Sequence, residues 1–293
     1  MTKAIFTVKA GSGYDDRPEE FYHFPRTYLN QVHVAVGDHI IYYEPRRSTE
    51  DKVGRQSYFA TARVTGIIED PIRQDHYYAQ ISDYLDFDHP VPFAQDGLYF
   101  ENSLRRVNGK TSKGAFGRAI RPISDQEFDL ILRNGFAVDF STSDGLAEVM
   151  GFEESPAEFV RPVIEMTISR PFRDVAFKRS VRLAYENQCA VTGLRLVNGG
   201  GRPEVQAAHI KPVSCNGPDS VRNGLALSST YHWMFDRGLI SFADDYRILV
   251  GEKVPEQARR MLNENGRLIL PDDKSQYPNP YYLQFHRSNV FKG

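Results

Sequence analysis

The chain has 293 residues, of which 41% are hydrophobic and 25% are charged, and its formal net charge is −2. These values are typical of a globular protein long enough for two domains, and the overall charge does not indicate a nucleic-acid-binding protein. No apolar run approaches the ~18 residues of a membrane-spanning helix, and the first residues do not resemble a secretion signal. The two cysteines could form one disulfide, but such sparse use favours a reduced, cytoplasmic protein.

The first part of the chain, about 115 residues, is predicted to form short strands between turns. Residues 4–10, 38–45, 57–68 and 76–87 are the strand candidates, because they are rich in Tyr, Phe and β-branched residues and are bounded by turn signals. Few helices interrupt these strands, so the pattern predicts a small barrel or a sandwich.

A helix is predicted in residues 124–136. Ser124 and Glu127 have the spacing of a capping box, an apolar stripe at helical spacing follows, and Gly135 can end the helix.

The composition then changes, which indicates a domain boundary. Residues 138–164 mix Ser, Gly, Glu and Pro and are predicted to be a linker between an N-terminal domain, 1–137, and a C-terminal domain, 165–293. A second helix is expected in residues 169–188, with Ser169 as its cap.

Basic residues gather at the start of the C-terminal domain. Between Arg161 and Lys211 there are nine Lys or Arg residues and four Asp or Glu residues. A local excess of this kind suits a polyanion such as nucleic acid, and it also suits a solvated helix face.

Residues 205–237 are predicted to form a strand, a loop, a second strand and a helix. The two strands are 205–210 and 225–227, and the turn-rich segment 214–224 lies between them. The helix can begin at Ser228 or Ser229 and end before Gly238.

Four polar side chains of this segment suit phosphodiester chemistry. His232 and Asp236 are four residues apart, so they share one helix face and can bind one divalent ion. A neutral imidazole at His209, on the preceding hairpin, can take a proton from water. Asn223 can tie the loop together by hydrogen bonds and orient this base.

The order His209, Asn223, His232, with intervals of fourteen and nine residues, resembles the HNH nucleases, which have a ββα-metal fold. The resemblance covers about residues 165–250. It is similar to one subgroup, common in bacterial restriction-type proteins, in the stretches FRDVAFKRSVRLAYENQCAVTG, AAHIKP and YHWMFDRGLISF.

The resemblance implies a role for each of these residues. His209 would be the general base, Asn223 would support the loop, and His232 and Asp236 would hold one Mg²⁺ or Mn²⁺ ion. The ion would polarise the scissile phosphate and stabilise the leaving 3′ oxygen.

The sequence departs from many HNH nucleases at two points. Many relatives place an acid or a histidine directly before the base, where this chain has Ala208, so Glu204 or Gln206 could contribute to the ion instead. Many relatives also carry paired cysteines for structural zinc. Here neither Cys189 nor Cys215 belongs to a Cys-x-x-Cys pair, so no structural zinc is predicted.

Two further features receive structural interpretations. Trp233, Met234 and Phe235 are expected to pack the predicted helix against the rest of its domain. The run Asn198–Gly201 could cradle a phosphate, or it could be a plain hairpin loop.

The N-terminal domain is similar to PUA-like domains, which include the EVE and YTH groups, in residues 21–47, 54–71 and 77–93. Such small barrels can hold a flipped base in an aromatic pocket. Joined to an HNH domain, a barrel of this kind resembles the modification-dependent restriction endonucleases, which cut foreign DNA that carries 5-methyl- or 5-hydroxymethylcytosine.

Candidate walls for a base pocket are polar or aromatic residues near the predicted strands. The aromatic walls would be Tyr22, Phe24, Tyr28, Tyr43, Tyr58 and Phe59. Asn30 or an Asp could read the base edge, and each aromatic residue could pack in the core instead.

The sequence thus predicts an α+β protein with a PUA-like reader and an HNH nuclease domain. It would cut double-stranded DNA that carries modified cytosine. One HNH site cuts one strand, so a homodimer is expected. Two alternatives remain open: a non-catalytic sensor with a decayed HNH fold, supported by Ala208, and an RNA-directed enzyme.

Overall fold

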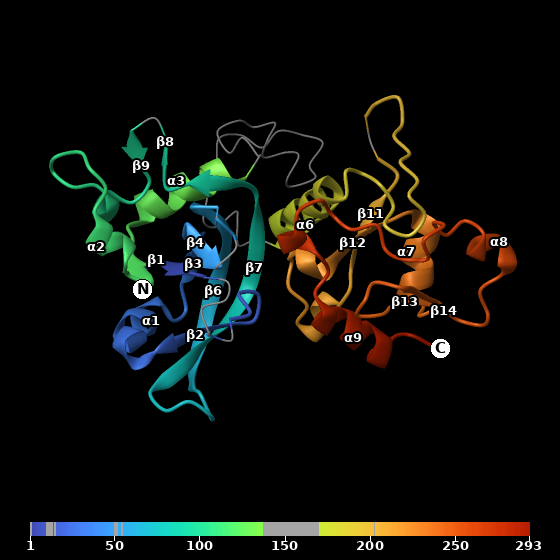
Figure 1. Ribbon diagram of the computed structural model, residues 1–293, viewed down its shortest axis with the longest axis horizontal. Coiled ribbons are helices and arrows are strands. Elements are labelled where there is room, and N and C mark those ends of the chain that lie inside the picture. The colour runs from blue at the N-terminus through green and yellow to red at the C-terminus, as the bar shows by residue number, and fades with distance from the viewer. Residues whose placement is uncertain are drawn as a thin grey trace. The chain divides into compact units, whose positions relative to one another are not determined.

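The computed structural model describes residues 2–9, 14, 16–49, 52–53, 55–95, 97–136, 170–201 and 203–293 (Figure 1). The chain divides into two compact units, Met1–Arg173 and Asp174–Gly293. The predicted linker, 138–164, and the predicted cap at Ser169 lie outside the described residues. Within the described ranges, no helix has both the length and the apolar character needed to span a membrane.

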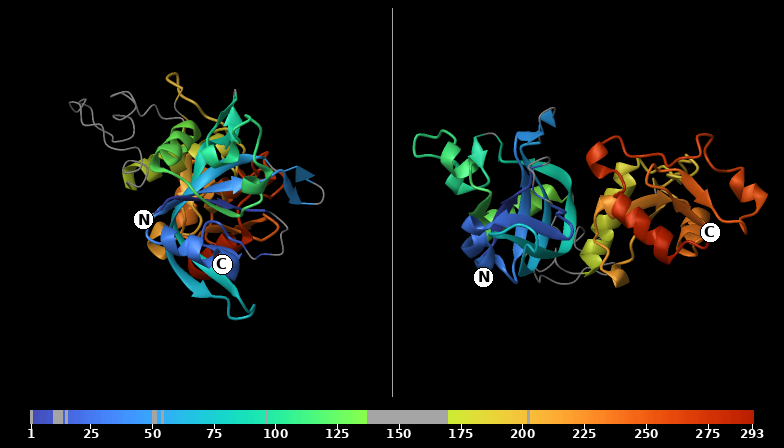
Figure 2. Two further views of the ribbon diagram at one scale, coloured as in Figure 1. Left: turned by 90° about the vertical axis from the view of Figure 1, so that its left-hand side faces the viewer. Right: turned by 60° about the horizontal axis from the view of Figure 1, so that its bottom comes forward.

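The first unit is built on one sheet of six strands in the order β10-β1-β3-β6-β7-β2. The β1 and β3 strands are parallel, and the other neighbouring pairs are antiparallel. The sheet curls along β6 and β7, which are its longest strands (Figures 1 and 2). The six strands are β1 (Ala4–Thr7), β2 (Phe21–Pro25), β3 (His39–Glu44), β6 (Ser57–Glu69), β7 (His76–Pro92) and β10 (Ile120–Pro122).

Helices and short hairpins complete the first unit. These elements are α1 (Leu29–Ala35), α2 (Lys113–Phe116), α3 (Asp125–Gly135), β4 (Arg47–Thr49), β5 (Lys52–Val53), β8 (Ala94–Gln95) and β9 (Leu98–Tyr99). The combination of helices with a largely antiparallel sheet confirms the predicted α+β class, and all four predicted strands are present. The PUA-like barrel remains a prediction.

The capping box predicted for α3 is present. The Ser124 Oγ accepts a hydrogen bond from the Glu127 N–H at 3.2 Å, and the Glu127 carboxylate accepts one from the Ser124 N–H at 2.7 Å. Both bonds satisfy backbone donors that the first turn of a helix leaves without an intrahelical partner.

Tyr22 and Phe24, two candidate walls of the base pocket, lie in the core on one face of the sheet. Both side chains are buried in the main hydrophobic cluster of the first unit. The Tyr22 hydroxyl donates a hydrogen bond to the Thr7 carbonyl at 3.0 Å. A base could stack on either ring only by displacing packed core side chains.

Tyr43 and Tyr58 are buried on the opposite face, beside an internal ion pair. The Arg121 guanidinium makes two bonds, of 2.7 and 2.8 Å, to the Glu101 carboxylate. The Tyr58 hydroxyl donates to the same carboxylate at 2.7 Å, and the guanidinium lies 5.3 Å from the Tyr43 ring centroid. These two tyrosines therefore surround a paired buried charge, and neither lines an open pocket.

The remaining three candidates are not grouped with these four. Phe59 is half-buried, with its ring centroid 5.9 Å from that of Tyr42. The hydroxyl of the half-buried Tyr28 accepts a hydrogen bond from the Ala119 N–H at 3.2 Å, and Asn30 is exposed on α1. The structure thus favours the core-packing alternative for the aromatic residues, and the candidates do not form one pocket.

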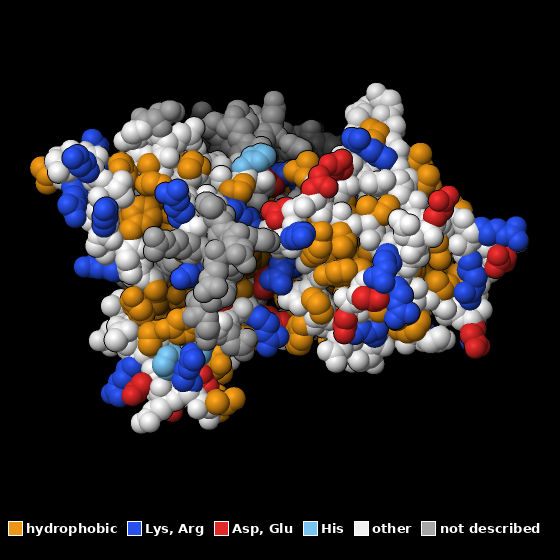
Figure 3. Space-filling model, viewed as in Figure 1, with side chains coloured by type: hydrophobic (Ala, Val, Ile, Leu, Met, Phe, Trp, Pro, Cys, Tyr) orange, Lys and Arg blue, Asp and Glu red, His pale blue; other side chains and the backbone are white. Residues whose placement is uncertain are grey.

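The second unit contains small antiparallel hairpins and short helices. Its elements are α6 (Arg170–Ala184), which begins before the unit boundary, β11 (Gln206–His209), β12 (Gly224–Leu227), α7 (Ser229–Asp236), β13 (Ile240–Phe242), β14 (Ile248–Val250), α8 (Glu256–Arg259) and α9 (Pro280–Asn289). The β11, β12 and α7 elements form the ββα arrangement that the sequence predicts. On the visible face of each unit, Lys and Arg side chains lie among Asp and Glu side chains (Figure 3).

His286 joins α9 to the core of the second unit. Its Nε2 donates to the Phe235 carbonyl at 3.1 Å, its Nδ1 accepts from the Ser241 hydroxyl at 2.9 Å, and its ring stacks on Phe235 at 3.7 Å. Burial lowers the pKa of His286 to about 4, because the apolar surroundings disfavour the charged imidazolium.

We expect the second unit to lose stability as the pH falls from 6.5 towards 4. In this window the unfolded chain protonates His286 and the folded chain does not, which costs up to about 3 kcal/mol at about 1.4 kcal/mol per pKa unit. Urea unfolding followed by the fluorescence of Trp233, the single tryptophan, measures this unit. The loss between pH 7 and pH 5 will be smaller in His286→Gln, and an equal loss in both proteins would refute the assignment.

Candidate active site

Side chains on the two faces of the β11 strand have different neighbours. Ala208 is 1% exposed and packs in the core of the second unit. Because successive side chains of a strand point to opposite faces, His209 lies on the other face of β11, where it meets Phe177 of α6. Ala208 shares its face of β11 with Gln206, which bonds His232, so an acid at position 208 would lie on the side of the strand that faces α7.

Gly224 lies opposite His209 in the hairpin and allows α6 to approach closely. A Cβ atom at Gly224 would lie 2.4 Å from the Val181 Cγ2 atom and 3.1 Å from the Phe177 ring. In the space this leaves, the Phe177 ring stacks on His209 with centroids 3.8 Å apart and an interplanar angle of 10°. The glycine thus lets one face of the base imidazole be fixed by packing.

Asp219 fixes the edge of the same imidazole. Its Oδ1 lies 3.0 Å from the His209 Nε2, and the carboxylate is 3% exposed. An ionised carboxylate can only accept hydrogen bonds, so Nε2 carries the proton and Nδ1 keeps its lone pair. The pair therefore presents Nδ1 of His209 as the atom able to take a proton from water.

Asn223 holds the loop that carries Asp219. Its Oδ1 accepts from the Lys211 N–H at 2.9 Å, and its Nδ2 donates to the Lys211 and Pro218 carbonyls at 3.0 and 2.9 Å. One buried amide therefore joins the chain just after His209 to the residue just before Asp219. This geometry gives physical content to the predicted loop-supporting role.

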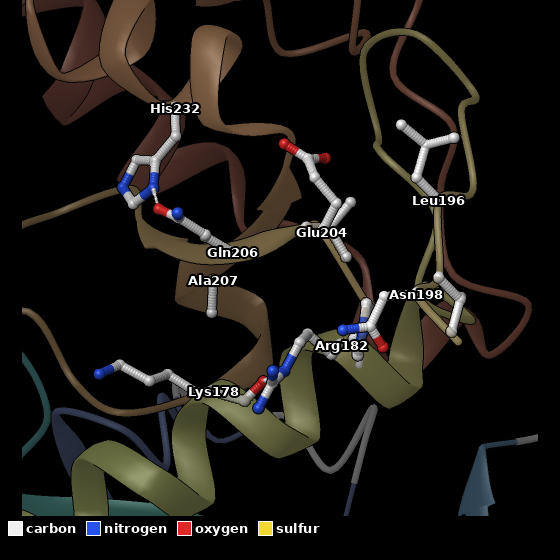
Figure 4. Close-up of a pocket in the computed structure, with 11 residues that line it drawn as sticks. Lys178, Arg182, Leu196, Asn198, Glu204, Gln206, Ala207 and His232 are labelled. Atoms are coloured by element: carbon white, nitrogen blue, oxygen red, sulfur yellow. Dashed lines mark hydrogen bonds between the residues drawn. The ribbon is translucent and has the colours of Figure 1, made fainter. Parts of the chain in front are cut away.

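Gln206 orients His232 through the other ring nitrogen, Nδ1. The His232 Nδ1 lies 3.0 Å from the Gln206 Oε1 (Figure 4), and the Gln206 amide nitrogen donates to the Ser229 hydroxyl at 3.3 Å. Since the amide oxygen accepts, Nδ1 carries the proton and Nε2 keeps its lone pair. A partner of this kind on the far nitrogen is the usual arrangement behind a metal-binding histidine.

The His232 Nε2 lies 3.5 Å from the Asp236 Oδ2, one turn further along α7. Two donors that bind one ion at about 2.0–2.2 Å lie roughly 3 Å apart, so this pair can hold a divalent cation after a small rotation. Among the described residues, no group of three or more His, Cys, Asp or Glu side chains could bind a metal. Water and phosphate oxygens would therefore complete the shell.

The two substitute ligands considered from the sequence have other partners. The Glu204 Oε1 accepts from the Ser229 N–H at 2.8 Å, at the N-terminus of α7, and Gln206 bonds His232. Gln206 thus acts on the ion through the imidazole, and Glu204 completes the helix N-terminus.

Two structural interpretations from the sequence are settled by the fold. Trp233 is 58% exposed, so its expected packing role is wrong, although Met234 and Phe235 are buried as expected. The run Asn198–Gly201 is a plain hairpin loop, closed by a bridge between its flanking residues and by a 3.0 Å bond from the Gly200 N–H to the Asn198 Oδ1.

Sequence reasoning missed Asp219, Phe177 and Gly224. Asp219 stands ten residues after His209 in a loop of turn-forming residues, where an aspartate ordinarily reads as a turn former. The signal that could have found it is the need of a general base for an orienting acceptor.

The family comparison bears on this same segment. Residues 189–243 match the model of the family described as HNH endonuclease. The matched range includes His209, His232 and the partners described above, except Phe177. The ββα segment of the second unit is therefore similar in sequence to HNH endonucleases. Nucleases with this segment use divalent metal ions, in agreement with the donor pair on α7.

Comparison with curated proteins gives no match. Among solved structures, the modification-dependent TagI restriction endonuclease is 15% identical with a TM-score of 0.33, covering 97% of this chain and 81% of that chain. The N-terminal domain of Staphylothermus marinus McrB is 10% identical with a TM-score of 0.32, covering 45% and 94%. The phosphorothioation-dependent Type IV restriction endonuclease ScoMcrA is 14% identical with a TM-score of 0.18, covering 79% and 46%. These likenesses are too distant to assign a substrate to this chain.

Replacing Asp219 by Asn is expected to lower the cleavage rate on the order of 10³-fold while the fold is kept. The amide can donate to Nε2 of His209, which moves the ring proton to Nδ1 and removes the base. Single-turnover cleavage of plasmid DNA measures the effect. The exposed Asp272→Asn carries the same chemical change and should cleave at the parent rate, and a parent-like rate in Asp219→Asn would contradict the assigned tautomer.

Mn²⁺ is expected to quench the fluorescence of Trp233 in a saturable way. The ion is paramagnetic, and Trp233 lies between His232 and Asp236 on α7. His232→Ala or Asp236→Ala should abolish the saturable quenching, and Gln206→Ala should weaken Mn²⁺ binding about 10–100-fold, since the histidine loses its orienting partner. Asp272→Ala serves as the matched control, and equal quenching in all five proteins would place the ion elsewhere.

Proposed function

We propose that the chain is a modification-dependent restriction endonuclease that hydrolyses phosphodiester bonds with one metal ion at its HNH site. The observation that carries the nuclease part is that two imidazoles in the HNH-like segment each have an oxygen partner on a different ring nitrogen, Nε2 of His209 and Nδ1 of His232. His209 presents a basic Nδ1, and His232 presents a ligating Nε2 beside the Asp236 carboxylate.

Each residue then has a defined task in the reaction. His209 takes a proton from the attacking water through Nδ1, and Asp219 stabilises the imidazolium that forms. Phe177 and Asn223 keep the ring and its loop in place. His232 and Asp236 would hold a divalent ion such as Mg²⁺ or Mn²⁺, which would supply positive charge beside the scissile phosphate and the leaving oxygen.

The first unit is proposed to read 5-methyl- or 5-hydroxymethylcytosine in double-stranded DNA by base flipping. The support is its similarity in sequence to PUA-like domains together with its curled, mainly antiparallel sheet. Extrusion of a base costs a few kcal/mol, which a pocket with stacking and edge hydrogen bonds offsets. Tyr22, Phe24, Tyr43 and Tyr58 are packed in the core, so other side chains would have to form that pocket.

A homodimer is part of the same proposal. One HNH site cleaves one strand, so a double-strand break needs two copies of the site on the duplex.

The test uses matched plasmids that carry plain, 5-methylated or 5-hydroxymethylated cytosine, incubated with the protein and Mg²⁺ or Mn²⁺. We expect cleavage of a modified plasmid, no cleavage of the plain one, and no cleavage by His209→Ala. Equal cleavage of all three plasmids would remove the reader and keep the nuclease. An intact set of plasmids with every metal would favour a sensor without catalytic activity.

A further inference from the structure

A groove of about 810 Å³ lies beside His232 in the second unit (Figure 4). The α6 helix forms one wall, the hairpin that contains residues 196–198 and 203 forms the other, and Glu204 to Ala207 form the floor. The hairpin is the golden loop that projects from this unit in Figure 1. His232, one of the two proposed metal ligands, is among the residues that line the groove, so the groove lies beside the proposed metal site.

The α6 wall of the groove is cationic. Lys178 and Arg182 are one helical turn apart on α6, and both line the groove (Figure 4). The Arg182 Nε donates to the Lys178 carbonyl at 3.0 Å, which holds the guanidinium stem along the helix. The one carboxylate among the lining residues, Glu204, is bonded to the N-terminus of α7. The groove is therefore suited to an anion.

The hairpin wall of the groove is apolar. Leu196 is 54% exposed and Val197 is 47% exposed, and both line the groove with Pro203. Aliphatic side chains that face a cationic wall suit a ligand with one charged side and one flat apolar side. A nucleotide has this composition, since its phosphate is anionic and its base and sugar offer apolar faces. The volume also lies within the range of about 300–1,000 Å³ typical of sites for ligands of this size.

We propose that this groove binds the nucleotides of the DNA strand that adjoin the cleaved bond. Their phosphates lie against Lys178 and Arg182, and their sugars and bases lie against Leu196 and Val197. The groove thereby fixes the position of the scissile phosphate relative to His232. The proposal rests on the proposed nuclease function, because the occupant is the substrate strand of that reaction.

The first measurement is DNA binding without metal, in the inactive His209→Ala background, by fluorescence anisotropy of a short labelled duplex over a series of salt concentrations. Lys178→Gln/Arg182→Gln is expected to weaken binding about tenfold or more and to lower the salt slope by about 2, since each lost phosphate contact removes roughly 0.9. Leu196→Ser/Val197→Ser is expected to weaken binding and leave the slope unchanged, because these contacts are apolar.

The matched control is Lys253→Gln/Lys292→Gln, which removes the same charge from two exposed lysines outside the groove lining. This control should bind DNA like the parent. An equal loss in the control and in Lys178→Gln/Arg182→Gln would overturn the proposal, because overall charge alone would then explain it. Binding by Lys178→Gln/Arg182→Gln with the parent affinity and slope would also overturn it. The exposed Lys178→Gln alone, with an expected slope change of about 1, guards against misfolding of the double variant.

Cleavage by the active protein separates this proposal from the nuclease assignment. In that background Lys178→Gln/Arg182→Gln should raise KM about tenfold or more and change kcat less, since the base and the metal ligands are intact. A parent protein that cuts no plasmid would refute the nuclease, while the binding series would still decide the groove. A parent that cuts, with groove variants of unchanged KM, would refute the groove alone.

Discussion

The chemistry of the second unit depends on two hydrogen bonds, each from a ring N–H to an oxygen that can only accept. Neutral imidazole has one proton for two nitrogens, so the acceptor chosen for one nitrogen decides the function of the other. Asp219 leaves the Nδ1 of His209 basic, and Gln206 leaves the Nε2 of His232 able to bind an ion. Two identical side chains thereby acquire different roles, and neither role could be inferred from the histidine alone.

Around these two bonds the fold supplies rigidity rather than reactive groups. Gly224 lets α6 come close enough for Phe177 to stack on the base, and Asn223 joins both ends of the loop that carries Asp219. On β11, the buried Ala208 packs in the core, and the next residue, His209, faces Phe177 of α6. Packing thus restricts the rotation of the imidazole, while the carboxylate sets its proton.

Local patterns in the sequence were sufficient for the elements and for the order of the site residues. Strand alternation, the capping box at Ser124 and the helical interval from His232 to Asp236 act over a few residues, so they can be read directly. The partners of the imidazoles come from loops and neighbouring strands, and their contacts depend on the folded path. The same limit explains the aromatic residues of the first unit: composition shows that Tyr22 or Tyr58 is present, but only the sheet decides that each faces inward.

The amide of Asn223 also separates the loop into two parts with different freedom. Residues Pro212 to Gly217 form a small loop of their own, which is closed by a 3.0 Å hydrogen bond from the Gly217 N–H to the Pro212 carbonyl. Cys215 is exposed in this small loop. Extra residues in this small loop would lengthen it and leave the His209 imidazole undisturbed. An insertion between Asp219 and Asn223 would instead move the Asp219 carboxylate away from His209. Related chains should therefore vary in length between Pro212 and Gly217 and keep a constant length between Asp219 and Asn223.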